Sequence, residues 1–189
     1  MNLRDLNQVP PNLPVPTDDG AAQHLVGMAL PTVRLRSTRG GDLVLSDLDL
    51  GTTIFYCYPM TGRPDLPNPE GWDEIPGARG CTPQACSYRD HWGELRGFGV
   101  DVYGVSAQST ADQAEAAERL HLPYPLLSDE QGELARALRL PTFGFGGRQL
   151  LKRLTLITRA HRIRACFYPV FPSDSDVGLV LGWLREQTT

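Results

Sequence analysis

The chain has 189 residues and a net charge of −4, from 18 basic and 22 acidic side chains. This balance favours neither nucleic acid nor an anionic membrane surface as a partner. No apolar run approaches the roughly 18 residues of a membrane span, and Met1 to Asp5 lack the apolar core of a signal peptide. We therefore expect a cytoplasmic globular protein whose four cysteines are reduced thiols.

Residues 1–26 are rich in Pro, Asn, Asp and Gln, which predicts an irregular arm before a domain over 27–189. Alternation in 32–37 and the run 43–45 predict a β-hairpin. The β-prone run 52–58 predicts a central strand covered on both faces. A long Pro-rich loop follows at about 60–80. The other expected elements are a helical turn at 47–49, helices at 83–96, 110–120, 132–138 and 174–184 (capped by Ser173 or Asp174), strands at 100–106 and 124–127, a hairpin at 142–153, and paired strands at 154–157 and 163–168.

This order predicts an α/β fold, with a mixed β-sheet flanked by helices on both faces and a β-hairpin on its N-terminal side. The Pro-rich loop and the cysteines that follow it come after the carboxyl end of the central strand. Open α/β sheets usually place their ligand sites at that edge.

Two cysteines, Cys81 and Cys86, stand five residues apart in the run 80–86 (GCTPQAC). Thr82 is expected to be the N-cap of the helix and Pro83 its first residue. Unpaired N–H groups and the positive end of the helix dipole favour a thiolate there. In an intact helix the two Cα atoms lie roughly 8–9 Å apart, whereas a disulfide tolerates about 7 Å. A pair that can bond only after a movement suggests a redox cycle.

The run 80–86, followed by Tyr88-Arg89-Asp90, resembles the peroxiredoxins of the bacterioferritin-comigratory-protein type, also called Q-type. Three further segments, 55–59, 125–129 and 152–157, resemble that family's strands in the same order, and the likeness covers roughly residues 25–187. The resemblance implies a thioredoxin-like fold and thiol-dependent reduction of hydrogen peroxide and organic hydroperoxides. It also implies no cofactor, thioredoxin or a similar dithiol as the reductant, and a monomer.

The resemblance implies a role for each of three residues. Cys81 is the expected peroxide-attacking thiolate, and Cys86 is the nearest thiol that can condense with its sulfenic acid. Arg153 is expected beside Cys81, where a guanidinium stabilises the thiolate and the departing oxygen. Cys57 and Cys166 are interpreted as core residues, although either would replace Cys86 as the resolving thiol if it faced the site.

One departure from the family pattern concerns the residues before Cys81. The family has Pro, three residues, Thr, two residues and then the reactive Cys, whereas Ala78 stands three residues before Cys81. Pro59 and Thr61 stand earlier, so about 15 residues are inserted. If the insertion follows Thr61, that residue supplies the hydroxyl for the peroxide and Pro59 a wall of the pocket. Otherwise another residue must supply the hydroxyl, and Thr82 is one option.

Two other functions use the same cysteines. In one, a thioredoxin-fold protein binds copper or zinc through Cys81, Cys86 and a histidine. Four residues separate the two thiols, whereas paired cysteine ligands of a metal are usually separated by two, and no histidine stands at ligand spacing. The other is a disulfide oxidoreductase acting on proteins, which the absence of Cys-x-x-Cys disfavours.

Overall fold

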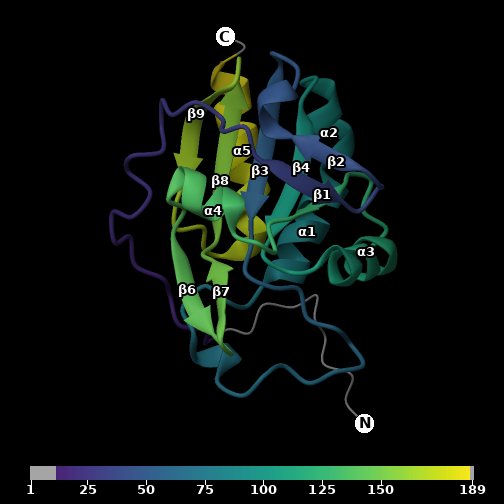
Figure 1. Cartoon of the computed structure of the whole chain (residues 1–189), viewed down its shortest axis with the longest axis vertical. Helices are drawn as coiled ribbons and strands as arrows, with labels where there is room; N and C mark the ends of the chain where they lie inside the picture. The colour runs from purple at the N-terminus through teal and green to yellow at the C-terminus, as the bar shows by residue number, and fades with distance from the viewer. Residues whose placement is uncertain (1–11, 188–189) are drawn as a thin grey trace.

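A computed structural model of the chain describes residues 12–187 (Figure 1). Residues 1–11 of the predicted arm and the last two residues lie outside the described residues. Seven strands form one sheet in the order β2-β1-β5-β4-β3-β8-β9. These strands are β1 (Arg34–Ser37), β2 (Asp42–Val44), β3 (Thr52–Cys57), β4 (Asp101–Ser106), β5 (Leu126–Ser128), β8 (Leu154–Arg159) and β9 (Arg162–Phe167).

Strand β3 lies inside the sheet and leads toward the cysteine pair. It pairs in parallel with β4 and antiparallel with β8, so the sheet is mixed. Because successive side chains alternate between faces, Ile54 and Tyr56 join one apolar cluster, whereas Phe55 and Cys57 join another. The predicted central strand, covered on both faces, is therefore confirmed.

The helices cover both faces of the sheet. Helices α1, α2 and α5 pack on the face that holds Tyr56, and α4 packs on the face that holds Phe55 (Figure 1). No helix among residues 12–187 is long and apolar enough to cross a membrane. The helices are α1 (Cys81–Asp90), α2 (Trp92–Gly97), α3 (Thr110–Arg119), α4 (Glu133–Leu138) and α5 (Asp176–Glu186).

Both predicted hairpins are confirmed. Strands β1 and β2 pair antiparallel at the end of the main sheet. Strands β6 (Thr142–Phe145) and β7 (Arg148–Leu151) form a separate two-stranded sheet. Their turn places Gly146 and Gly147 at φ values of 56° and 74°, which glycine adopts most readily. The helical turn expected at 47–49 lies two residues earlier, at Leu45–Asp47.

The single helix predicted over 83–96 is wrong, because the structure has two. Helix α1 ends at Asp90 and α2 begins at Trp92. Between them His91 has φ −99° and ψ 11°, and its ring Nδ1 lies 2.9 Å from the carbonyl oxygen of Ser87. The backbone N–H of His91 donates to the same Ser87 carbonyl oxygen, so the ring and the backbone of His91 both contact it.

The last helix also begins later than predicted. Residues Ser173–Ser175 form a short 3-10 turn, and α5 starts at Asp176. Neither Ser173 nor Asp174 caps it, because the N-cap is Ser175, which makes no side-chain capping bond. This shift brings Asp176 into the interior, where its side chain is fully buried.

The Pro-rich insertion is packed against the body of the protein. The short 3-10 helix Trp72–Glu74 buries the Trp72 ring against Phe143 and Phe145 of the β6–β7 hairpin. Ala78 belongs to the same small apolar cluster. Arg79 forms an ion pair with Asp73, at 3.4 Å. The insertion thus has a core of its own, and that core fixes the chain just before α1.

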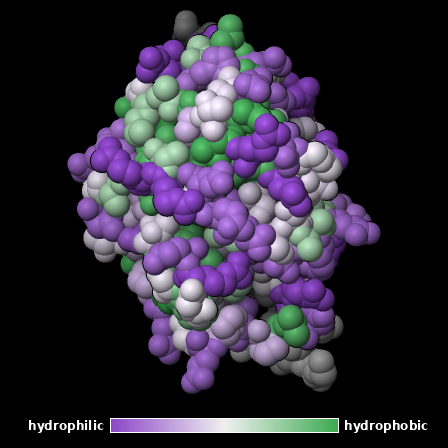
Figure 2. All heavy atoms as spheres, in the orientation of Figure 1, coloured by the Kyte–Doolittle hydropathy of each residue, from purple (hydrophilic) through white to green (hydrophobic). Residues whose placement is uncertain are grey.

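In the orientation of Figure 1, most of the visible surface is hydrophilic, and hydrophobic residues lie among the hydrophilic ones (Figure 2). The large apolar side chains that are most exposed come from separate parts of the chain. They are Val15, Val26, Leu50, Leu66 and Leu179.

Candidate active site

Helix α1 begins at Cys81 itself. Its N-cap is Gly80, whose φ of 100° lies in the region that glycine favours. The prediction that Thr82 caps the helix and Pro83 opens it is therefore wrong, since Thr82 is the second helical residue and makes no capping bond. The sulfur of Cys81 consequently lies in the first turn, where backbone N–H groups lack helical partners and the dipole is positive. The Cys81 residue is only 4% exposed.

Arg153 meets Cys81 in the interior. It stands directly before β8 and is 3% exposed. Its Nη2 lies 3.2 Å from the Sγ of Cys81. The same nitrogen is within hydrogen-bond distance of the carbonyl oxygens of Gly77, Ala78 and Arg79, at 3.2, 3.3 and 3.0 Å. The guanidinium is thus held by the chain that leads into α1, and it presents positive charge to the sulfur.

A buried polar network stands behind Arg153. Its Nη1 donates to Oε1 of Gln84, and Nε2 of Gln84 donates to the carboxylate of Asp176 at 2.6 Å. The hydroxyls of Tyr88 and Thr155 donate to the same Asp176 oxygen, at 3.1 and 2.8 Å. Burial raises the pKa of Asp176, whereas the hydrogen bonds from Gln84, Thr155 and Tyr88 lower it. The network joins α1, β8 and α5 around the guanidinium.

Gln84 and Asp176 were not among the residues predicted from the sequence. They are 92 positions apart, and a single sequence carries no local signal that pairs them. The only hint of this network in the sequence was the acidic residue Asp176 near the start of the last predicted helix. An acidic residue there is also explained by its favourable interaction with the helix dipole.

Cys86 lies in the same unbroken helix as Cys81, and both are free thiols. Residues five apart in a helix point in directions that differ by about 140°. Cys86 accordingly faces a different region, a 610 Å³ surface groove that Arg89 and Arg119 also line. Burial raises the pKa of the half-buried Cys86 thiol. A Cys81–Cys86 disulfide therefore requires α1 to unwind locally.

Thr61 and Pro59 lie near the carboxyl end of β3. The Thr61 hydroxyl is buried and donates to Oε1 of Gln108 at 3.0 Å. Among the described residues, the hydrogen-bond partners of the Cys81 sulfur are Arg153 and the carbonyl of Ala78, so Thr61 is not hydrogen-bonded to it. Pro59 lines a pocket together with Arg153. The roles of Thr61 and Pro59 in the reaction stay predictions.

The other two cysteines pack in the apolar interior. Cys57 is fully buried in the core, and burial raises its pKa. Cys166 packs against the same cluster, and burial raises its pKa to about 12. Within residues 12–187, no three His, Cys, Asp or Glu side chains form a group that could hold a metal ion.

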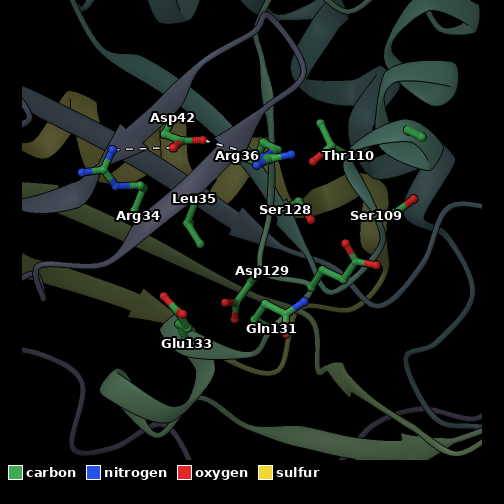
Figure 3. A pocket seen from close by; sticks show the side chains of 12 residues that line it. Arg34, Leu35, Arg36, Asp42, Ser109, Thr110, Ser128, Asp129, Gln131 and Glu133 are labelled. Carbon is green, nitrogen blue, oxygen red and sulfur yellow. Dashed lines mark ion pairs between the residues drawn. The ribbon is translucent and has the colours of Figure 1, made fainter.

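Another groove lies away from the cysteines. It measures 680 Å³ and lies between the β1–β2 hairpin and the starts of α3 and α4. Figure 3 shows Arg34 and Arg36 beside Asp42, with nitrogen–oxygen distances of 3.6 and 3.9 Å, and Asp129 and Glu133 across from them. None of the cysteines lines it, and neither does Arg153. Arg153 lines a separate pocket of 390 Å³, and no cysteine is among the residues that line that pocket.

Comparison with known proteins agrees with this geometry. A model of the AhpC/TSA family matches residues 75–164, which contain both cysteines of α1 and Arg153. A chloroplastic peroxiredoxin Q of Gentiana triflora is 30% identical over 155 residues, covering 78% of this chain and 64% of the relative. A peroxiredoxin bcp of Coxiella burnetii is 28% identical over 162 residues, covering 84% of this chain and 97% of the relative. The chain spans only 51% of the length of two rice relatives, also peroxiredoxins Q.

Solved structures show the same architecture. The peroxidoxin BcpB of Mycobacterium tuberculosis superposes with a TM-score of 0.69 at 25% identity, covering 86% of this chain and 98% of that one. The bacterioferritin comigratory protein of Xanthomonas campestris gives a TM-score of 0.67 at 20% identity with the same coverage, which shows the shared fold. The thioredoxin-like fold expected from the sequence is confirmed, and the metal-binding alternative gains no support. Over residues 75–164 this chain is similar to the AhpC/TSA family, and its relatives include peroxiredoxins of the Q or bacterioferritin-comigratory type.

Proposed function

We propose that the protein is a thiol-dependent peroxidase that reduces hydroperoxides with Cys81. The observation that carries this proposal is the 3.2 Å contact between Nη2 of Arg153 and the sulfur of Cys81 at the start of α1. A guanidinium cation and a helix N-terminus both favour the thiolate, which is the nucleophilic form of cysteine. The relatives of this chain carry the name peroxiredoxin, which points to the same chemistry.

In the first step the Cys81 thiolate attacks the terminal oxygen of a hydroperoxide ROOH. A sulfur–oxygen bond forms and the oxygen–oxygen bond breaks, so that the sulfur loses two electrons and becomes a sulfenic acid. The leaving RO⁻ takes up a proton and departs as the alcohol, or as water when R is hydrogen. Negative charge grows on that oxygen during the step, and the fixed guanidinium of Arg153 stabilises it.

In the second step the thiol of Cys86 condenses with the sulfenic acid, which forms a disulfide and releases water. Helix α1 must unwind between the two residues first, because an intact helix holds them too far apart. An external dithiol then reduces the disulfide and is itself oxidised. Thioredoxin is the reductant we propose, since the exposed groove beside Cys86 leaves this sulfur open to a protein partner.

The test is mass spectrometry after one equivalent of hydrogen peroxide is added to the reduced protein. We expect the wild type to lose two hydrogens and to yield a peptide pair joined through Cys81 and Cys86. The Cys86→Ser variant should instead gain one oxygen on Cys81, and dimedone should trap it. Oxidation that falls on Cys57 or Cys166 while Cys81 stays reduced would refute the assignment.

A further inference from the structure

The Gln84 amide holds one end of the Arg153 guanidinium, while the other end contacts the Cys81 sulfur. Gln84 is fully buried in α1, and its Oε1 accepts the hydrogen bond from Nη1 of Arg153. A guanidinium carries donors only, so the amide atom that faces it must be the oxygen. The NH2 group of Gln84 must then find an acceptor in the protein interior, because the residue has no contact with bulk water.

Asp176 supplies this acceptor from the start of α5. Its Oδ2 lies 2.6 Å from Nε2 of Gln84, and the residue is fully buried. The hydroxyls of Tyr88 and Thr155 donate to the same oxygen, so donors from α1 and β8 converge on one atom. Within residues 12–187 the other oxygen, Oδ1, has no hydrogen-bond partner. The carboxyl group is therefore tied to this network through Oδ2.

Without the Asp176 oxygen, the Gln84 amide would lose the contact that fixes its orientation. Its NH2 group would be buried without a partner, which costs free energy. A half-turn of the amide would direct this group toward Arg153, where two sets of donors would face each other. Nη1 of Arg153 would then lose its acceptor, and the guanidinium would be held at one end only.

We propose that Asp176 is a positioning residue for the reaction of Cys81, because it fixes the Gln84 amide that holds the Arg153 guanidinium against the sulfur. The inference rests on the proposed peroxidase function, since it concerns how the attacking thiolate is stabilised. The negative charge of an ionised Asp176 has the opposite effect, because a nearby anion disfavours a thiolate. Loss of the positioning bond and loss of the charge therefore predict changes of opposite sign.

The experiment measures the rate of Cys81 alkylation by iodoacetamide as a function of pH, with peptide mapping to separate the cysteines. Only the thiolate reacts, so the midpoint of the profile reports how well the thiolate is stabilised. Asp176→Leu keeps a branched side chain but has no acceptor oxygen. We expect its midpoint to lie about one pH unit above that of the wild type, which means a rate about tenfold lower below the midpoint. An unchanged or lower midpoint would overturn the inference.

Two variants that keep an acceptor for Gln84 are the controls. Asp176→Asn retains one carbonyl oxygen for the three donors, and its NH2 group takes the place of Oδ1, where no hydrogen bond is lost. Tyr88→Phe removes a different donor to the same oxygen and keeps the ring that stacks on Tyr56. Neither variant should raise the midpoint. If either raised it as far as Asp176→Leu does, Asp176 would act by packing α1 and not through Gln84.

A second variant and a second readout complete the test. If circular dichroism shows that Asp176→Leu does not fold, Asp176→Ala removes the oxygen without adding bulk, and the same rise in the midpoint is expected. Below the midpoint, the rate constant with hydrogen peroxide should also fall about tenfold, and an undiminished constant would contradict a role in the reaction. Alkylation needs no peroxide. If the wild type consumes no hydroperoxide, the peroxidase proposal fails, and the alkylation profile still decides whether Asp176 positions Arg153.

Discussion

At the scale of single residues, the proposed chemistry depends on how Arg153 is held. Its guanidinium reaches three successive carbonyls and the Cys81 sulfur from one nitrogen, and Gln84 from the other. The charge is thus in place before a peroxide arrives. A preorganised charge of this kind costs no reorganisation free energy during the reaction.

Arg153→Lys tests this arrangement. Lysine keeps the positive charge but carries no planar fork, so it cannot contact the carbonyls and the sulfur at once. We expect kcat/KM for hydroperoxides to fall by about 10²–10³-fold, the usual loss when a charge-stabilising donor is removed. The control is Arg148→Lys on the β6–β7 hairpin, whose side chain donates to the Ala107 carbonyl instead. Equal activity in both variants would show that the fork is not needed.

The four cysteines should differ in reactivity. Burial raises the pKa of Cys166 to about 12, so at pH 8 it is almost entirely the neutral and unreactive thiol. We expect iodoacetamide to label Cys81 in the native protein at least about a hundredfold faster than Cys166. Peptide mapping of timed samples measures this order. Labelling of Cys166 at a rate like that of Cys81 would contradict it.

At the scale of elements, α1 is held tightly although its proposed reaction requires it to unwind. The Tyr88 ring stacks on Tyr56 with 4.6 Å between centroids, and the Tyr124 hydroxyl donates to the Ala85 carbonyl at 2.7 Å. Gln84 and Tyr88 are both tied to Asp176 at the start of α5. Unwinding of α1 between Cys81 and Cys86 must break several of these contacts. The contacts therefore contribute to the free energy that unwinding requires.

Asp176→Asn should change how stability depends on pH. Because burial raises the pKa of Asp176, its folded state binds a proton more tightly than the unfolded state does. The stability it contributes is full below the unfolded value near 3.8 and is lost as pH rises through the folded pKa. Asparagine does not titrate, so the Tm of the variant minus that of the wild type should rise between pH 4 and pH 8. Thermal denaturation at several pH values measures this, and a constant difference would rule out the titration.

The strands could be predicted from the sequence because their apolar residues alternate or run continuously, as in β3. The hairpin at Gly146 and Gly147 was equally predictable from its turn residues. The start of α1 was not, since Gly80 takes a left-handed conformation and Thr82 is buried instead of capping. Which residue caps a helix depends on how the chain packs before the helix as well as on the residue type.

The candidate site was predictable where a motif carries it. Cys81, Cys86 and Arg153 follow from the resemblance, and the structure places Arg153 beside Cys81. The network through Gln84 and Asp176 could not be predicted, because its members meet only after α5 packs on α1. The docking of the insertion through Trp72 likewise depends on contacts with a distant hairpin.

At the scale of the whole molecule, the support for α1 extends into the sheet through Gly104 on β4. A Cβ there would lie 2.5 Å from Cδ2 of Leu126 and 2.6 Å from the Tyr56 ring, which itself supports α1. Gly104→Ala should therefore lower the free energy of unfolding by about 1–3 kcal/mol. Urea denaturation measures it.

The matched control for Gly104→Ala is Gly182→Ala in α5. A Cβ at Gly182 would meet nothing within 4 Å, and alanine is the better helix former. We expect this variant to gain up to about 1 kcal/mol. If both alanines changed stability in the same direction, close packing around Gly104 would not be the cause.

The whole account depends on Cys81 being the atom that cleaves the peroxide bond. The most direct measurement is steady-state hydroperoxide consumption, coupled to thioredoxin, thioredoxin reductase and NADPH, for wild type and Cys81→Ser. The wild type should turn over repeatedly, and the serine variant should fall to the rate seen without protein, because a hydroxyl there is not ionised. Undiminished consumption by Cys81→Ser would contradict the account.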